Sequence, residues 1–473
     1  MLATSPSPLV IDSLPQFDAE LVARYDITGP RYTSYPTAPQ FHPGFGEQQL
    51  RAMAYASNED PIPRPLSIYV HVPFCFSPCF YCGCTRIITR DRTRADTYIA
   101  RLVDEIGMTA PLFDPDRQVV QLHLGGGTPN FLDAGQASAL MNALGQAFAL
   151  SPDADREFGI EIDPRHADAE SIRLLARLGF NRLSVGIQDF DEDVQRAVNR
   201  VQSVEETRIV IDAAREYGFR SVSVDLIHGL PRQTPERFAK TLAEVIALAP
   251  DRIATYSYAH LPERFRAQQR IRAEEIPDSA MRLALLGQSV EILCAAGYRY
   301  IGMDHFALPG DDLAVAQRHG GLHRNFQGYS THAECDLIGL GVSAIGHLGR
   351  SFHQNARELP AYYSALAAGQ LPVQRGLMLD DEDVIRGDAI QRLMCDGHLD
   401  IAAFEQRHNV DFARSFAAEI SRLRQLRQDG LVELTPQAID VTARGRFLLR
   451  VIAMCFDAYL APSADTSRFS RTV

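Results

Sequence analysis

The chain has 473 residues, of which 46% are hydrophobic and 22% are charged. These values are typical of soluble globular proteins and exclude a disordered or collagen-like chain. A net charge of −12 repels phosphate backbones and anionic lipids, so we expect neither nucleic acid nor membrane as a partner. The sequence contains no long uncharged apolar run and no basic N-terminal leader, which predicts a cytoplasmic protein.

Residues 1–60 are rich in proline and predict an irregular N-terminal arm. Within it, the stretch 29–36 is too polar and too rich in turn-forming residues for a buried element. We therefore expect the arm to lie over another part of the molecule.

Six apolar segments of strand length then alternate with amphipathic helical segments, a pattern typical of a parallel α/β sheet. The predicted strands are residues 66–72, 119–124, 158–162, 182–186, 222–227 and 252–256. Together they predict an incomplete TIM-like (β/α)6 barrel over residues 61–305, which a helix at 281–296 and a strand at 298–302 extend. Residues 306–375 are predicted to connect or extend this barrel.

The pattern becomes mostly helical from residue 376, with a hairpin near 431–441 and a helix at 444–453. It predicts a helical C-terminal domain over residues 376–473, with an arrangement similar to a winged helix. The last ten residues predict a polar tail.

Four of the eight cysteines lie directly after the first predicted strand, as Cys75, Cys79, Cys82 and Cys84. This clustering favours a metal site over a disulfide framework. Structural zinc sites usually combine two CxxC pairs from separate segments, whereas these thiols belong to one loop. Three thiolates spaced CxxxCxxC would hold three irons of a [4Fe–4S] cluster and leave the fourth iron open. A zinc-stabilised scaffold is the alternative.

Glycines and polar side chains follow the next strands at the points where the strands end. The second strand is followed by Gly126, Gly127 and Thr128, and later strands end near Glu161, Gln188 and Asp225. Taken singly, the glycines are more often turns and the carboxylates more often surface groups. Because the catalytic residues of barrel enzymes gather at the carboxyl ends of strands, their repetition there favours a site.

The cysteine spacing resembles that of the radical S-adenosylmethionine enzymes. The resemblance implies that Cys75, Cys79 and Cys82 are the catalytic cluster ligands and that S-adenosylmethionine binds the open iron. An electron from the cluster would then cleave the sulfonium and yield a 5′-deoxyadenosyl radical. The protein would supply orientation and water exclusion.

From about residue 20 to its end, the chain also resembles the oxygen-independent coproporphyrinogen III oxidase family. The stretches that carry this resemblance are the cysteine loop and residues 29–38, 125–129, 181–190, 198–200, 302–307, 323–329 and 454–457. Leu124 departs from the family, which often has tryptophan there. A packing difference is the expected consequence.

This resemblance implies anaerobic oxidative decarboxylation of two propionates of coproporphyrinogen III, giving protoporphyrinogen IX in haem biosynthesis. It also implies two bound S-adenosylmethionine molecules. The residues implied for the first are Tyr69, Gly126, Glu161 and Ile345. Those implied for the second are Tyr81 or Cys84, with Gly127, Thr128, Gln188, Arg200, Asp225 and Ala259.

The remaining partners are expected from the reaction. Coproporphyrinogen III carries four carboxylates, for which Arg31 and Arg324 are the candidate partners, although surface solvation explains each equally well. An electron donor and an electron acceptor are required, and we expect a monomer. A related haem chaperone that binds haem without this catalysis is the alternative, but such proteins usually lack the N-terminal arm and the cysteine that matches Cys84.

Overall fold

The computed structural model describes residues 14–332, 335–460 and 471. Its main feature is a curved sheet whose order is β10-β11-β9-β8-β7-β6-β4-β1-β14-β15-β16-β17. Six consecutive members of this order are parallel and lie where the sequence predicts strands. They are β1 (Leu66–Val72), β4 (Gln118–Gly126), β6 (Glu157–Ile162), β7 (Arg182–Gln188), β8 (Ser221–His228) and β9 (Arg252–Ser257).

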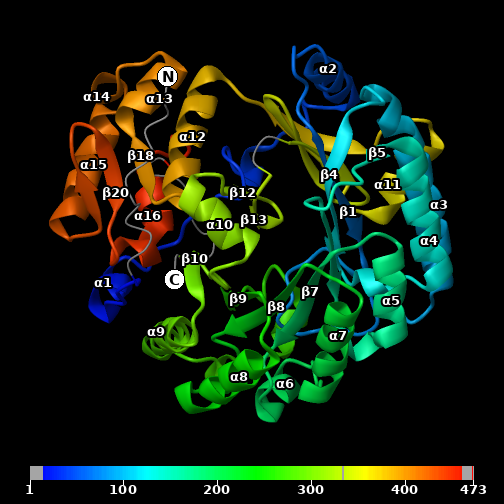
Figure 1. The fold of residues 1–473 in the computed structure, drawn as a ribbon, viewed down its shortest axis with the longest axis horizontal. Coiled ribbons are helices and arrows are strands. Elements are labelled where there is room, and N and C mark those ends of the chain that lie inside the picture. The colour runs from blue at the N-terminus through cyan, green and yellow to red at the C-terminus, as the bar shows by residue number, and fades with distance from the viewer. Residues whose placement is uncertain (1–13, 333–334, 461–470, 472–473) are drawn as a thin grey trace.

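Helices cover the outer face of this sheet (Figure 1). They are α3 (Thr93–Thr109), α4 (Ala134–Ala147), α5 (Ala169–Arg177), α6 (Glu192–Ala197), α7 (Val204–Glu216), α8 (Pro235–Leu248) and α9 (Ser279–Ala295). Side chains cap the starts of several of these helices: Asp133 accepts from the Gln136 N–H and Thr234 from the Arg237 N–H. Buried leucine, valine and isoleucine fill the space between helices and sheet.

The sheet continues beyond both ends of the parallel set. Strands β10 (Arg299–Gly302) and β11 (His305–Ala307) join β9 in antiparallel pairing. At the other edge, β14 (Asp336–Leu340) pairs parallel to β1. It is followed by antiparallel β15 (Ile345–Leu348), β16 (Ser351–Asn355) and β17 (Val373–Met378). The remaining elements of this region are α10 (Asp312–His319), α11 (Leu359–Ala367) and the hairpin β12 (His323–Asn325) and β13 (Gly328–Ser330).

Residues from Asp381 onward form a helical unit with a small sheet, in agreement with the sequence. Its helices are α12 (Asp381–Cys395), α13 (Ile401–His408), α14 (Phe412–Ser415), α15 (Ala417–Gln428) and α16 (Leu449–Met454). Its strands are β18 (His398–Asp400), β19 (Val432–Leu434) and β20 (Ala438–Val441), in the order β18-β20-β19. In the described part of the chain, no helix has the length and apolarity that crossing a membrane requires.

The N-terminal arm corrects two expectations. It is not irregular throughout, because it contains α1 (Ala19–Arg24) and α2 (Glu47–Asn58). The stretch predicted to be unburied is in fact buried, with Tyr32 only 2% and Tyr35 6% exposed. Their hydroxyls supply the polar partners that burial requires: Tyr32 donates to Asp457 at 2.9 Å, and Tyr35 accepts from the Ala458 N–H. Most of the predicted polar tail lies outside the described residues.

Candidate functional site

The cysteine loop leaves the carboxyl end of β1 and packs against the start of the next βα unit. Two short parallel strands, β2 (Phe74–Cys75) and β3 (Ile87–Ile88), hold its ends together. Cys75 and Cys79 are 8% and 9% exposed, and Cys84 is exposed. A cavity of about 170 Å³ lies beneath the loop. Predicted site residues that line it are Cys75, Cys79, Tyr81, Cys82, Cys84, Gly126, Gly127, Thr128, Glu161, Gln188, Arg200 and Asp225.

Hydrogen-bond donors approach three of the sulfurs. The Thr128 hydroxyl donates to Cys75 Sγ at 3.3 Å, and the backbone N–H of Cys84 donates to Cys82 Sγ at 3.4 Å. Arg200 Nη1 lies 3.6 Å from Cys79 Sγ. Burial raises the pKa of the Cys75 thiol to about 11. Donors of this kind stabilise negatively charged sulfur, so the surroundings fit an iron–sulfur cluster held by thiolates.

The glycines after β4 allow the strand end to touch the cysteine loop. A Cβ at Gly127 would lie 2.7 Å from the Pro73 backbone, and one at Gly126 would lie 2.5 Å from the His71 ring. Gly126 also has φ +110°, which side chains rarely adopt. A side chain at Gly127 would therefore displace the backbone where the cysteine loop begins, and one at Gly126 would displace the His71 ring.

Two carboxylates face the cavity from neighbouring parts of the barrel. Glu161 accepts from His123 Nε2 at 3.1 Å and from the Gly126 N–H at 3.2 Å. Although burial opposes ionisation, these contacts hold the pKa of Glu161 below its usual value. Asp225 accepts only from Ser184 Oγ, at 3.1 Å, among the hydrogen bonds of the described residues. Burial and the Glu161 charge raise the pKa of Asp225 to about 7.

This pair of carboxylates suits a positively charged ligand. No arginine or lysine in the described residues makes an ion pair with Asp225, so a cation that enters the cavity can compensate its charge. S-adenosylmethionine carries a sulfonium and an ammonium group. The donor set therefore fits both groups that the sequence implies, the cluster at the thiols and S-adenosylmethionine beside it.

Arg200 connects the thiol side of the cavity with the strand ends. It is 7% exposed, donates to the Gly186 carbonyl at 2.6 Å and pairs with Asp163 at 3.2 Å. Although burial opposes ionisation, Arg200 and Arg165 lower the pKa of Asp163 to about 2.

Gln188 lies at a register shift between β7 and β8 with φ +69°. Bulges and strained backbone of this kind are common where a strand end directs a side chain into a site.

Three predicted residues do not line this cavity. Tyr69 points into the barrel, where its ring stacks on His123 with centroids 6.1 Å apart. Ile345 begins β15, and its backbone lies beside Gly339, the β14 partner of Tyr69. Ala259 contributes a carbonyl that accepts from Gln268 Nε2, which also donates to the Tyr81 carbonyl. Tyr69 and Ala259 are thus each linked to a lining residue through one intermediate side chain, His123 and Gln268 respectively, whereas Ile345 lies farther from the cavity.

The sequence analysis missed several residues of this site: His71, His123, Asp163, Arg165 and Ser184. The histidines could have been found from strand alternation, because His71 and His123 share a face with Tyr69 and Gly125, two positions away along β1 and β4. The Tyr69 hydroxyl lies 3.2 Å from His71 Nδ1. Of these residues, His123 orients Glu161 and Ser184 orients Asp225 through their hydrogen bonds.

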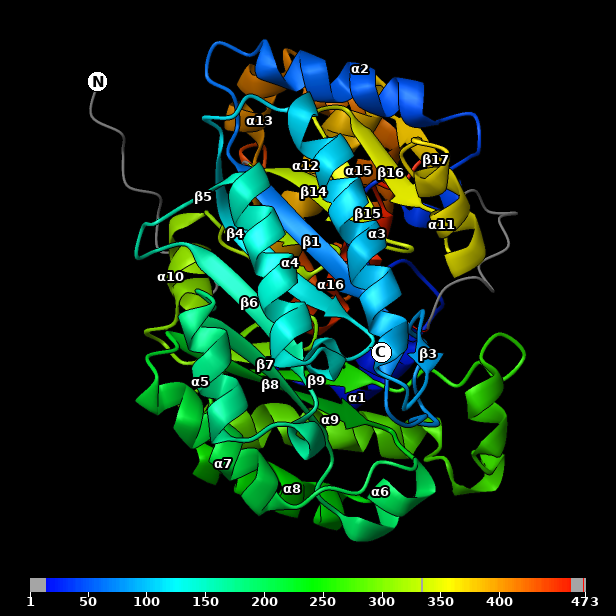
Figure 2. The same ribbon diagram turned by 90° about the vertical axis from the view of Figure 1, so that its right-hand side faces the viewer.

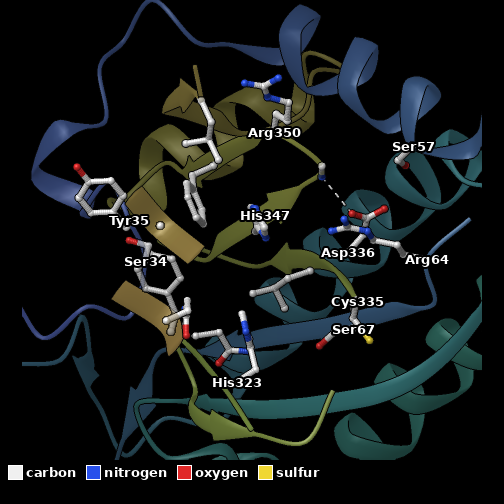
Figure 3. A pocket seen from close by; sticks show the side chains of 18 of the residues that line it. Ser34, Tyr35, Ser57, Arg64, Ser67, His323, Cys335, Asp336, His347 and Arg350 are labelled. Atoms are coloured by element: carbon white, nitrogen blue, oxygen red, sulfur yellow. Dashed lines mark hydrogen bonds between the residues drawn. The ribbon is translucent and has the colours of Figure 1, made fainter. Parts of the chain in front are cut away.

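A larger cavity of about 470 Å³ lies at the amino end of β1, between the arm, α2, α12 and β14 to β16 (Figure 3). His323, His347, Arg64 and Arg350 reach toward it from different elements, as the close view shows.

A third cavity of about 150 Å³ occupies the barrel interior. It shares Gln121 with the larger cavity and shares Glu161, Ser184 and Asp225 with the cluster-side cavity.

The two arginines considered for substrate carboxylates differ in their surroundings. Arg31 pairs with Asp304 at 3.4 Å and lies over the Tyr256 ring. Arg324 is 3% exposed, stacks on Tyr329 and lines the larger cavity. Among the described residues, its Nη1 has no hydrogen-bond partner. Arg324 is therefore the better placed of the two for an anionic ligand.

Comparison with known proteins agrees with this geometry. The profile of the Radical SAM superfamily matches residues 69–245, and that of the HemN C-terminal domain matches residues 379–448. The structure of coproporphyrinogen III oxidase (HemN) from Escherichia coli, described as a radical SAM enzyme, is similar with a TM-score of 0.90 and 46% identity. The match covers 95% of this chain and 100% of that one.

Curated relatives are similar over nearly their whole length. The oxygen-independent coproporphyrinogen III oxidase of Pseudomonas aeruginosa is 50% identical, over 97% of this chain and 99% of its own. That of Helicobacter pylori is 39% identical, over 96% and 99%. These relatives carry the name of the enzyme and not of a haem chaperone or a zinc scaffold. The chain belongs to the oxygen-independent coproporphyrinogen III oxidase family, within the radical S-adenosylmethionine superfamily.

Proposed function

We propose that this protein converts coproporphyrinogen III to protoporphyrinogen IX without oxygen, turning two propionates into vinyl groups with loss of two molecules of carbon dioxide. The observation that carries the proposal is the single cavity that joins the three thiols Cys75, Cys79 and Cys82 to Glu161 and Asp225. Full-length similarity to enzymes named for this reaction supports it.

Cys75, Cys79 and Cys82 would hold the [4Fe–4S] cluster. When bound, the cluster and S-adenosylmethionine supply a 5′-deoxyadenosyl radical that removes hydrogen from the substrate. Glu161 and Asp225 would bind the cationic and hydroxyl groups of the cofactor, and the glycines after β4 would let it approach the backbone. The cysteine loop and the βα loops around the cavity exclude water from the reacting atoms.

The first cofactor position would comprise Tyr69, Gly126, Glu161 and Ile345. Hydrogen bonds linking Glu161 to Gly126 and to His123, on which Tyr69 stacks, support this grouping. The second position would comprise Tyr81 or Cys84, with Gly127, Thr128, Gln188, Arg200, Asp225 and Ala259. It is supported by the cavity that most of this second group shares.

The larger cavity is the proposed entrance for the substrate and the place for its carboxylates. Arg324 Nη1 and Ser34 Oγ are buried in its wall without partners among the described residues. Unsatisfied buried polar groups are rare in native proteins and are expected where a ligand completes them. Apolar side chains such as Phe326 and Leu337 supply another part of the wall, which suits a macrocycle with apolar ring faces and an anionic rim.

We also propose the four-part division into arm (1–60), barrel (61–305), extension (306–375) and C-terminal domain (376–473). It is supported by the change from sheet to helical packing near Asp381. The protein would act as a monomer in the cytoplasm, with an external electron donor and acceptor and without nucleic acid or membrane.

The function is tested by an anaerobic assay of the purified protein with coproporphyrinogen III, S-adenosylmethionine and a chemical reductant. We expect protoporphyrinogen IX, 5′-deoxyadenosine and methionine as products. Tight haem binding without formation of 5′-deoxyadenosine would contradict the proposal, as would zinc without iron or labile sulfide after anaerobic reconstitution.

A further inference from the structure

Two chain segments beside the cysteine loop carry a positive charge that contrasts with the rest of the molecule. Residues 83–97 and 261–272 contain eight arginines and three carboxylates, although the whole chain has a net charge of −12. The first segment runs from the cysteine loop into α3, and the second follows β9. The net charge of these two segments beside the cysteine loop is therefore positive, whereas that of the whole chain is negative.

Direct contacts attach both segments to the cysteine loop. A Cβ on Gly83 would lie 3.1 Å from the Phe265 ring, so the second segment covers the outer side of the loop. Arg92 lies over the Phe76 ring and Arg270 over the Phe80 ring, each 5.3 Å from the centroid. Figure 2 shows β3 and the lower end of α3 beside the green segment that follows β9.

Most of these arginines have no partner that would neutralise them. Arg272 is exposed but pairs with Glu275 at 3.5 Å. We name the other exposed arginines of the two segments the arginine rim: Arg90, Arg92, Arg94, Arg264, Arg266 and Arg270. In the described residues, no carboxylate lies within ion-pair distance of any of the six. Other exposed arginines do pair, as Arg101 does with Asp104 at 2.9 Å and Arg173 with Glu170 at 2.6 Å. The six therefore form one group of unpaired positive charges on the segments that adjoin the cysteine loop.

We propose that the arginine rim docks a small acidic electron-transfer protein. The inference rests on the proposed function, because cleavage of each sulfonium consumes one electron from outside the enzyme. The carrier, through a reduced flavin or iron–sulfur centre, loses one electron. That electron passes through the cluster and breaks the bond between sulfur and C5′, and no proton moves in this step. Complementary charge brings two proteins together in the correct orientation and raises their association rate.

The geometry favours such a protein over other anions. Gly83 and Cys84 are exposed, and Gly83 adjoins Phe265 of the second segment, so a carrier bound to the rim lies close to the thiols. A nucleic acid would also meet arginines, but the acidic remainder of the chain repels a long polyanion. A compact acidic surface of the size of the rim avoids that repulsion.

The test compares two triple variants of equal charge change. R90E/R94E/R266E reverses part of the rim, and R414E/R424E/R427E reverses exposed arginines on the C-terminal helical unit. The rate of 5′-deoxyadenosine formation is measured with a reduced acidic flavodoxin and, separately, with dithionite. We expect the rim variant to raise KM for flavodoxin about tenfold and the control variant to leave it within twofold. Dithionite is small and needs no docking surface, so its rates stay unchanged.

Direct binding of flavodoxin to the unaltered protein provides a second measurement that does not depend on any variant. We expect affinity to fall steeply as ionic strength rises from about 0.05 to about 0.5 M. Equal KM values for the two variants, or affinity independent of salt, would overturn the docking proposal while dithionite-driven cleavage continued. Absence of cleavage with dithionite in the unaltered protein would instead overturn the proposed function.

Discussion

Cys84 has surroundings that separate it from the other three thiols of the loop. It is exposed, whereas Cys75 and Cys79 are buried, and its backbone N–H donates to Cys82 Sγ. Three thiolates already leave one iron open, and a fourth from Cys84 would close it. We therefore expect its side chain to act on the second cofactor or its neighbourhood.

Alanine at Cys75, Cys79 or Cys82 should abolish cleavage of S-adenosylmethionine, because each variant would remove one of three iron ligands. Cys84→Ser should retain four irons and four sulfides per chain while its turnover of coproporphyrinogen III falls. Iron and sulfide analysis after anaerobic reconstitution, together with 5′-deoxyadenosine formation, measures both effects. Cleavage retained in any alanine variant would refute that ligand, and loss of iron in Cys84→Ser would place Cys84 among the ligands.

Residues were predictable from the sequence where their signal was local. The three cysteines and the glycines after β4 follow one another in a short stretch of chain, so their spacing was sufficient. Strand alternation could have indicated His123, whereas Ser184 was missed because its role appears only when β7 is aligned with β8, which carries Asp225. Arg324 was named only as one of two equal candidates, and its unpartnered nitrogen in a cavity wall became visible only in the folded chain.

Among the elements, the six parallel strands were predicted correctly, but the strands beyond β1 were not. Strand β14 pairs with β1, although about 270 residues separate them in sequence. Apolar alternation predicts that a strand exists, not which strand it joins. The arm was predicted to be irregular and unburied because no local pattern reveals what covers it. Its tyrosines are buried by partners from the C-terminal unit, which lie far away in the sequence.

A buried carboxylate on α3 fixes the turn between β14 and β15, and so the placement of Ile345. Glu105 is 2% exposed, accepts from the Gly341 N–H at 2.8 Å and receives bonds from Asn355 and Tyr362 at 2.6 and 2.5 Å. Although these bonds favour the ionised form, burial raises the pKa of Glu105 to about 7. The turn therefore depends on a group that titrates near neutral pH.

Because this folded-state pKa exceeds the usual glutamate value, the folded protein binds more protons than the unfolded chain between about pH 4.5 and 7. Its contribution to the free energy of unfolding is thus complete below that range and is lost as pH rises through 7. From pH 5 to 8, the unaltered protein should lose about 3 kcal/mol more than Glu105→Gln, which cannot ionise. Denaturant unfolding at both pH values measures this difference, and parallel losses in the two proteins would contradict it.

At the scale of the whole molecule, the arm joins the C-terminal unit to the open side of the barrel. Arg450 on α16 is buried and donates to the Pro30 carbonyl at 2.9 Å. Further along the arm, Arg31 pairs with Asp304, which directly precedes β11 at the barrel edge. Ser34 and Tyr35 then line the larger cavity. The arm is therefore one wall of the space proposed for the substrate, and none of its residues from 14 onward lines the cavity under the cysteine loop.

Deleting residues 1–37 should consequently separate the two halves of the reaction. Cleavage of S-adenosylmethionine by dithionite in the absence of substrate should persist, because the thiols, Glu161 and Asp225 belong to the barrel. Decarboxylation of coproporphyrinogen III should be lost, because one wall of the larger cavity and the Arg31 contact are removed together. Both products are measured by chromatography from the same anaerobic reactions.

Tyr32→Phe, which removes only the hydrogen bond to Asp457 and keeps the buried ring, serves as the matched control and should retain decarboxylation. A truncated protein that decarboxylates as fast as the full chain would show that the arm is not part of the substrate site.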